Sequence, residues 1–210
     1  MFNDAHLLND MVLRKQKTMT RRLAKYRGNK EVGYYSWPRG MVVGDGQYCF
    51  IECLDANEEH FEPEIYIRSE YHVGEVVAIA QSYLSLSSDD NPLFLLGDEI
   101  GDTGKTEVIC SKDTAGWNNK MFVKAEYMPH HIRITGIKAE MLQEISEEDM
   151  LKEGILQSRG RFLHYQPKQP NWLAFNTPVA AFHSLIDRVS GKGTWDENPI
   201  VFAYEYELID

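Results

Sequence analysis

The sequence predicts an α+β fold with a curled, mixed β-sheet. Strand-like runs occur at residues 47–54, 73–80, 133–138 and 199–208, and the last run alternates along most of its length. Short helix-like segments interrupt these runs without regular alternation, so a doubly wound parallel sheet is not expected. With 210 residues, 43% of them hydrophobic, the chain is long enough for one domain, and we expect that domain to span residues 1–210.

A first helix is expected near the N-terminus. Asn3 or Asp4 can cap it, and it continues to about Gln16. Its apolar residues recur at the three- and four-residue spacing of one buried stripe. They are Leu7, Leu8, Met11 and Val12.

Two later helices carry start signals. Ser146, with Asp149 three residues later, begins a helix to about residue 155 that places Glu153 two turns in. Thr177 and Pro178 open another helix, because proline is favoured at the first helical position. The apolar face of this last helix comprises Ala181, Phe182, Leu185, Ile186 and Val189, and Gly191 ends the helix.

The net charge of −10 disfavours a protein that coats nucleic acid through bulk electrostatics. Between Arg14 and Lys30, however, there are eight basic residues and no acidic one, whereas residues 31–210 carry 14 basic and 30 acidic side chains. A concentrated basic segment on an acidic chain suits a local anionic ligand, such as a phosphate or a short stretch of RNA. A solvated basic turn without a ligand explains the same pattern.

No apolar run approaches the roughly 20 residues that a membrane-spanning helix needs, so no membrane partner is expected. The three cysteines, an odd number, argue against a disulfide framework and favour a cytoplasmic location. Cys49 and Cys53 can share one strand face, but small buried hydrophobes explain them better than a metal pair. We predict no metal and no cofactor.

The segment Lys17-Thr-Met-Thr-Arg-Arg22 follows the first helix directly. It combines an amine, two hydroxyls and two guanidiniums, which can hold an anion or polarise a carbonyl. A lysine that is partly desolvated beside arginines also has a lowered pKa, as a general base requires. The structural alternative is that the threonines cap a turn and the arginines lie on the surface.

Together with blocks elsewhere in the chain, this segment resembles the ASCH domain family, most closely its prophage-type and gut-bacterial members. The blocks occur in the right order along the whole chain. They are Phe2-Asn3 with the first helix, Lys17–Arg22, Tyr71–Tyr83, Met128-Pro129 with Arg133-Ile134, Ile145–Gly154, Phe182–Asp187 and Trp195–Pro199.

The resemblance implies a PUA-like mixed β-barrel with flanking helices, since ASCH domains are similar in fold to the PUA RNA-binding domain. It also implies a cleft between barrel and helices that recognises RNA or a modified nucleoside. The binding residues that we expect are Thr18, Arg21, Arg22, Arg133 and Trp195. Compared with a small member of the family, insertions are expected at about residues 31–70, 84–120 and 156–176.

That small member is an amidohydrolase that removes acyl groups from the exocyclic amine of cytidine. The resemblance aligns its catalytic residues with Lys17 as the base, Thr20 as the nucleophile and Glu153 as the acid. Acetylcytidine hydrolysis is therefore an alternative function. A phage-related module that binds another protein is a second alternative, and the acidic composition suits it. Glu153 also has a structural interpretation as a solvated helix carboxylate, and Trp195 as a core or cleft-wall residue.

Overall fold

The computed structural model describes residues 6–27, 42–43, 48–50, 53–54, 60–61, 66–86, 94–96, 108–110, 113–167 and 171–210. These residues divide into two compact units. The larger unit comprises the described residues within 3–76 and 133–208, and the smaller one comprises those within 77–132 together with 209–210. The expectation of a single domain over 1–210 stays a prediction.

The principal sheet is curled, antiparallel and shaped as a half-barrel. Its strand order is β1 (Met19–Leu23), β15 (Ile200–Leu208), β11 (His131–Met141) and β8 (Val76–Ala78). Strand β1 pairs with β15 in a register that sets Met19 opposite Glu205 and Leu23 opposite Val201. The predicted α+β class is confirmed, although the described strands of this sheet are antiparallel and the expected sheet was mixed.

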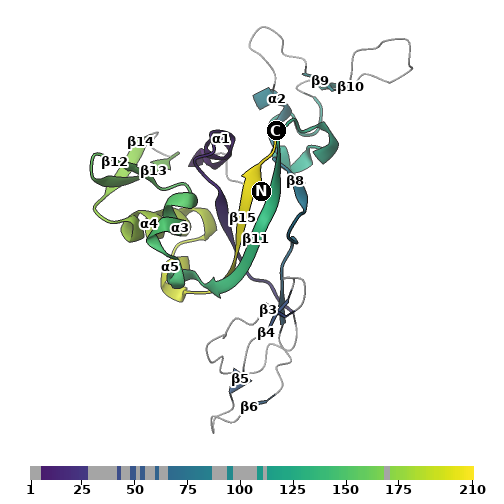
Figure 1. Ribbon diagram of the computed structural model, residues 1–210. Coiled ribbons are helices and arrows are strands. Elements are labelled where there is room, and N and C mark those ends of the chain that lie inside the picture. Colours follow the sequence, from purple (N-terminus) through teal and green to yellow (C-terminus); the bar gives the residue numbers. More distant parts are fainter. Residues whose placement is uncertain are drawn as a thin grey trace. The chain divides into compact units, whose positions relative to one another are not determined.

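In the larger unit, four helices lie on one side of β1 and β15 (Figure 1). They are α1 (Leu8–Leu13), α3 (Glu147–Lys152), α4 (Pro178–Ser190) and α5 (Thr194–Glu197). The core between α3, α4 and the sheet comprises Leu142, Ile145, Met150, Ile155, Ala181, Phe182, Leu185, Ile186 and Val201. Val201 faces this core from β15, so neighbouring residues that share its sheet face also lie toward the helices.

The start signals of α3 and α4 are confirmed. The Ser146 hydroxyl accepts the Asp149 amide at 3.1 Å, and the Thr177 hydroxyl accepts the Ala180 amide at 3.2 Å. Helix α4 ends at Gly191, whose φ of 122° is a backbone conformation that favours glycine.

The expected bounds of the other helices need correction. Helix α1 begins only at Leu8, after Leu7 in a left-handed conformation with no side-chain cap, and Asn3 and Asp4 lie outside the described residues. Glu153 is not two turns inside a helix but is the C-terminal cap of α3.

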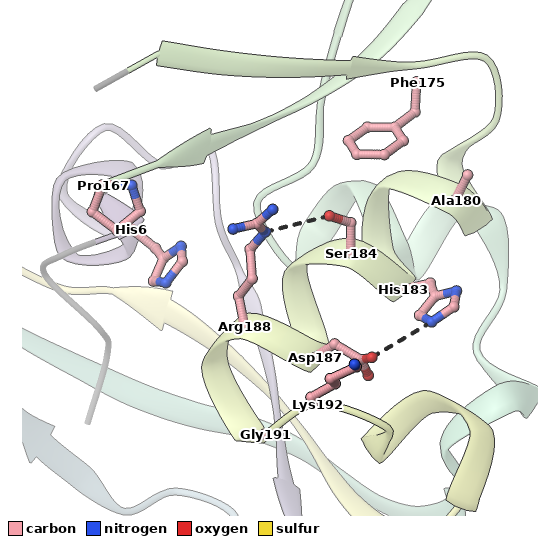
Figure 2. A pocket seen from close by; sticks show the side chains of 10 residues that line it. All are labelled: His6, Pro167, Phe175, Ala180, His183, Ser184, Asp187, Arg188, Gly191 and Lys192. Atoms are coloured by element: carbon pink, nitrogen blue, oxygen red, sulfur yellow. Dashed lines mark hydrogen bonds and ion pairs between the residues drawn. The ribbon is translucent and has the colours of Figure 1, made fainter. Parts of the chain in front are cut away.

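The segment 156–176, expected as an insertion, forms a three-stranded antiparallel sheet. Its strands are β12 (Leu156–Ser158), β13 (Arg161–Gln166) and β14 (Asn171–Phe175). Helix α4 packs on β13 and β14, and Figure 2 shows Phe175 of β14 with the α4 residues Ser184, Asp187 and Arg188. That these strands are an insertion relative to a smaller domain stays a prediction.

Within residues 26–68, described strands form two small sheets. One has the order β2 (Tyr26–Arg27), β7 (Tyr66–Arg68), β4 (Tyr48–Phe50) and β3 (Val42–Val43), and the other pairs β5 (Cys53–Leu54) with β6 (His60–Phe61). The side chains of the three cysteines lie outside the described part, so neither interpretation of Cys49 and Cys53 is tested.

The smaller unit contains α2 (Tyr83–Leu86), the antiparallel pair β9 (Phe94–Leu96) and β10 (Val108–Cys110), and the 3₁₀ turns η2 (Lys120–Phe122) and η3 (Ala125–Tyr127). Tyr83, Trp117 and Met128 form its core. The segment 84–120 is therefore not a continuous loop, because its short apolar runs at 94–96 and 108–110 pair as strands.

A buried histidine on β13 makes stability depend on pH. His164 is 1% exposed, and its ring stacks on Phe175 with centroids 5.5 Å apart. Burial is the largest cause that lowers the pKa of His164, and nearby Arg188 and His6 lower it further, against a hydrogen bond to the Tyr165 carbonyl. The folded protein therefore holds this ring neutral at pH values where the unfolded chain protonates it.

We expect the free energy of unfolding to fall as the pH drops below about 6.5, the ordinary histidine pKa. In this range the unfolded state binds more protons, so His164 contributes a slope of up to about 1.4 kcal/mol per pH unit. The variant His164→Gln removes this contribution, whereas His72→Gln at an exposed position keeps it. Urea unfolding between pH 5 and 7.5 measures both slopes, and an unchanged slope in His164→Gln contradicts the prediction.

Candidate functional site

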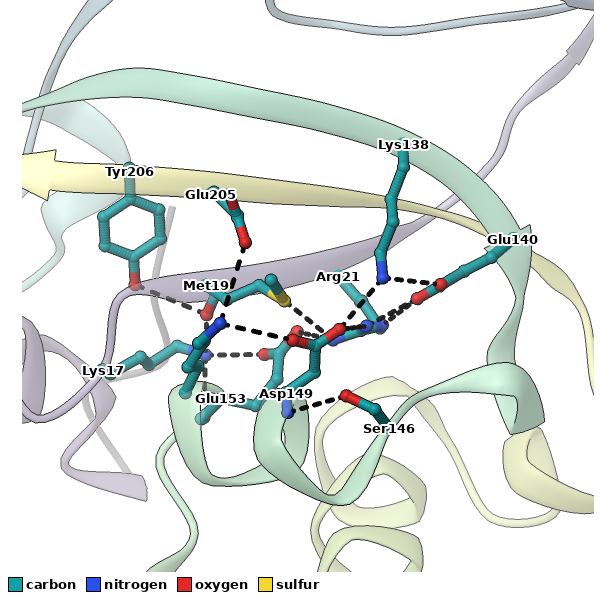
Figure 3. Close-up of polar contacts among 11 residues, drawn as sticks. Lys17, Met19, Arg21, Lys138, Glu140, Ser146, Asp149, Glu153, Glu205 and Tyr206 are labelled. Carbon is teal, nitrogen blue, oxygen red and sulfur yellow. Dashed lines mark hydrogen bonds and ion pairs between the residues drawn. The ribbon is translucent and has the colours of Figure 1, made fainter. Parts of the chain in front are cut away.

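The sequence-predicted residues Lys17, Arg21 and Glu153 meet where the start of β1 packs against the end of α3 (Figure 3). Met19 and Arg21 are buried on one face of β1, because side chains alternate along a strand. Lys17, just before the strand, is 3% exposed and Glu153 is 5% exposed. The alternative that Glu153 is a solvated carboxylate is therefore wrong.

The Lys17 ammonium donates to three oxygens. They are the Met19 carbonyl at 2.7 Å, the Glu153 carbonyl at 2.8 Å and Glu153 Oε2 at 2.7 Å. Three acceptors match the three N–H groups of an ammonium. Burial lowers the pKa of Lys17, and Glu153 opposes this shift. In this arrangement the amine has no lone pair directed at a ligand.

Arg21 is surrounded by three carboxylates. Its Nη1 donates to Glu153 Oε1 at 3.0 Å, its Nη2 to Asp149 Oδ2 at 3.1 Å, and its Nε and Nη2 to Glu140 Oε1 at 2.7 and 2.5 Å. These carboxylates more than offset the burial of the guanidinium and raise the pKa of Arg21. Arg21 therefore joins β1 to both β11 and α3.

Lys138 closes the network from β11. Its ammonium lies 3.0 Å from Glu140 Oε2 and 3.0 Å from Asp149 Oδ2. Burial acts to raise the pKa of Asp149, but Lys138 and Arg21 outweigh it and hold that pKa below its usual value. We call Lys17, Arg21, Lys138, Glu140, Asp149 and Glu153 the ionic network. Lys152 also lies 3.6 Å from Asp149 Oδ1 at the edge of this network, and it pairs with Glu148 and Glu205 as well. Each cation of the network thus has at least one carboxylate partner.

Gly154 allows α3 to approach α1 directly after Glu153. Its φ is +102°, and a Cβ there would lie 3.0 Å from Met11 Sδ and 3.3 Å from Leu8 Cδ2. Any side chain would meet these core atoms in a backbone conformation that favours glycine. Because α3 lies close to α1 at this point, Glu153 can reach Lys17.

Thr20 and Arg22 point away from the ionic network. Strand alternation places both on the opposite sheet face from Arg21, with Thr20 paired to Tyr204 and Arg22 to Phe202 of β15. Both side chains are half-buried. The three residues proposed for acyl transfer are thus split, with Lys17 and Glu153 on one face and Thr20 on the other.

Neither Arg133 nor Trp195 takes part in the ionic network. Arg133 makes a surface ion pair on β11 with Glu207 at 3.1 Å, and both side chains are about half exposed. Trp195, in α5, packs edge-on to Phe182 and stacks on His183 of α4, with centroids 6.1 and 5.6 Å away. It belongs to the α4 core side, as its structural interpretation predicted.

A small pocket of about 240 Å³ lies beside Lys17. It is lined by Val12, Lys15, Lys17, Thr18, Tyr206, Glu207 and Leu208. The Tyr206 hydroxyl donates to the Met19 carbonyl at 3.5 Å, and burial raises the pKa of Tyr206 well above its usual value, so the phenol stays protonated. Lys15 is exposed at the rim. This pocket is a concave site beside the Lys17–Arg22 segment in the part of the chain that the structure describes.

No family model, no curated protein and no solved structure matches the chain. Among the described residues, no group of three or more histidine, cysteine, aspartate or glutamate side chains is arranged to hold a metal ion. Nor does any described helix have the length and apolar character needed to cross a bilayer.

Sequence reasoning did not identify Lys138, Glu140 or Asp149 as partners of Arg21, although it used Asp149 as a helix-start signal. Lys138 and Glu140 stand two apart in β11 and therefore share one face. Two charged residues at this spacing indicate that one face of the strand carries charged side chains. Their meeting with Arg21, 119 residues before Glu140, depends on the sheet order β1-β15-β11.

Breaking the ionic network should strongly destabilise the protein. We expect Arg21→Met to lower the free energy of unfolding by about 3–5 kcal/mol, because three buried carboxylates lose a shared cation. Arg14→Met removes an exposed pair to Asp10, with side chains 67% and 48% exposed, and should cost less than about 1 kcal/mol. Denaturant unfolding of both variants tests this, and equal losses contradict it.

Proposed function

We propose that this chain is a PUA-like ASCH domain that recognises a nucleoside, free or within RNA, in the pocket beside Lys17. The curled half-barrel sheet with helices along one side is compatible with such a fold. The observation that carries the proposal is the pocket itself, which adjoins the Lys17–Arg22 segment and combines apolar walls with hydrogen-bonding groups.

The lining suits one uncharged, polar planar group. Val12 and Leu208 supply apolar surface, while the Thr18 hydroxyl and the Glu207 carboxylate can contact the edge of a base. Small-molecule sites have this composition of mostly apolar walls with a few polar groups. Both backbone polar groups of Thr18 are hydrogen-bonded, since its amide donates to the Lys152 carbonyl and its carbonyl accepts the Tyr206 amide, each at 3.0 Å.

The charge arrangement favours recognition of the base over the phosphate backbone. Lys17 and Arg21 are occupied by carboxylates, and the exposed Lys25 pairs with Glu70. Lys15 remains at the pocket rim as a cation for one phosphate. Binding of a single-stranded oligonucleotide should therefore have a shallow salt dependence, with a slope of log K against log[salt] of about −0.7 for one contact.

We expect Thr18→Val to weaken nucleoside binding about tenfold, because one hydrogen bond in a partly buried pocket is lost while the side-chain shape is kept. Cytidine, acetylcytidine and a short single-stranded RNA are the probes, with affinity measured by calorimetry. Thr135→Val, at an exposed position of β11, is the matched control. Equal affinities of the two variants for every probe would remove this pocket as the binding site.

Hydrolysis of acetylcytidine is a second candidate, favoured by the 2.7 Å contact between Lys17 Nζ and Glu153 Oε2. In that reaction the Thr20 hydroxyl attacks the acyl carbon and its proton passes to Lys17. Glu153 protonates the departing amine, and water then hydrolyses the acyl-threonine. Lys17 must first pass its ammonium proton to Glu153 along their 2.7 Å contact, which makes Lys17 the base and Glu153 the acid. Thr20 must also reach the reacting carbon from the other face of β1.

Chromatography of acetylcytidine incubated with the protein separates the two candidates. The hydrolase predicts conversion to cytidine that is lost in Thr20→Val and kept in Thr135→Val. A wild-type protein that binds acetylcytidine without converting it supports recognition alone. Thr20 is half-buried and contributes no hydrogen bond to the ionic network, so the Thr20→Val variant should fold, which thermal melting verifies.

A further inference from the structure

A second and larger pocket, of about 900 Å³, lies along α4 in the larger unit (Figure 2). We call it the α4 pocket. It is lined by His6, Pro167, Phe175, Ala180, His183, Ser184, Asp187, Arg188, Gly191 and Lys192. Its volume is within the range of about 300–1,000 Å³ that is typical of small-molecule sites.

The cations of this pocket lack carboxylate partners, in contrast to those of the ionic network. Within the described residues, the closest polar contact of Arg188 is a long one, from Nε to the Ser184 hydroxyl at 3.5 Å. No described carboxylate forms an ion pair with Arg188 or Lys192. In a chain of net charge −10, two such cations in one concave site attract an anion.

Asp187, the carboxylate in the pocket lining, is occupied by other donors. It accepts the backbone amides of Gly193 and Trp195, each at 3.0 Å, and lies 3.6 Å from His183 Nε2. Burial acts to raise the pKa of Asp187, but these two amides and His183 hold it below its usual value. Asp187 therefore fixes the start of α5 and forms no ion pair with Arg188 or Lys192. Counting these two cations against the one carboxylate, the lining keeps a net positive charge.

The buried His164 sets the direction of the Ser184 hydroxyl. His164 Nδ1 lies 3.3 Å from the Tyr165 carbonyl and must carry the proton to bond it, so Nε2 accepts the Ser184 hydroxyl at 3.0 Å. The Ser184 lone pairs are then left to accept from Arg188. This arrangement holds the base of the guanidinium and leaves its two terminal nitrogens to meet a ligand.

We propose that the α4 pocket binds a small phosphate monoester that carries a planar group. A phosphate monoester has a charge of about −1.5 to −2 near pH 7, and Arg188 and Lys192 can both contact it because Asp187 is directed to backbone amides and His183. A guanidinium binds phosphate oxygens bidentately. Because the pocket greatly exceeds a phosphate ion, the rest of the ligand lies against its apolar part, formed by Pro167, Phe175 and Ala180. This site is independent of the pocket beside Lys17.

The test uses adenosine 5′-monophosphate, adenosine, and a short 5′-phosphorylated RNA as probes in calorimetric titrations of the full chain. We expect the mononucleotide to bind more tightly than adenosine. The Arg188→Gln variant should weaken its binding at least about tenfold, the effect of losing charge-assisted hydrogen bonds. Arg159→Gln, at an exposed position away from both pockets, should change it less than about twofold. Preferential binding of the phosphorylated RNA identifies a strand end as the source of the phosphate.

Two results would overturn the proposal: no saturable binding of either phosphorylated probe, or equal affinities in Arg188→Gln and Arg159→Gln. Arg188 is exposed, so its variant should keep the wild-type melting temperature. Thr18→Val should leave mononucleotide binding unchanged, which separates this site from the proposed nucleoside pocket. A ligand-dependent shift of the His183 ring resonance, observed by NMR, locates the bound probe on α4.

Discussion

The contact between Arg21 and its three carboxylates is the constraint on which the larger unit depends. A guanidinium whose side chain is 1% exposed must have ionic partners, because an unpaired buried charge costs several kcal/mol. Glu140 lies on β11, and Asp149 and Glu153 lie in and after α3. A shift of β1 by one residue would turn Arg21 to the opposite face and leave these carboxylates without it. The network therefore selects one register of β1 against β15 and one position of α3.

The parts of this fold that sequence predicted well are those determined by neighbouring residues. Thr177, Pro178 and Gly191 define α4 because cap, first-turn proline and terminating glycine act within their own turn. Ser146 defines the start of α3 for the same reason. Residues 156–176 were missed as strands because β12, β13 and β14 are stabilised by pairing with each other and by contact with α4, and this information is not in any one segment.

The charges of the candidate site show the same contrast between what neighbouring residues determine and what contacts with distant residues determine. Sequence located the cationic segment and the pair Lys17 and Glu153. A segment without acidic residues suited either an anionic ligand or a solvated turn, and neither interpretation included carboxylate partners from elsewhere in the chain. In the folded protein the carboxylates that neutralise Arg21 come from 119 to 132 residues later in the chain. A segment with an excess of positive charge in the sequence therefore need not have an excess of positive charge around it in the folded protein. Pairing across the sheet decides which cations remain for a ligand.

The α4 pocket gave no sequence signal, because the contacts of its charged side chains also depend on the folded structure. Arg188 and Lys192 stand four residues apart at the end of an amphipathic helix, where basic residues are ordinary because they interact favourably with the helix dipole. What distinguishes them is Asp187, which accepts two backbone amides of the next turn and forms no ion pair with either cation. The direction of the Asp187 carboxylate follows from the way α5 begins. A carboxylate that caps one helix leaves the cations of another available, and the acidic chain keeps a positive concave site in the unit that also holds the pocket beside Lys17.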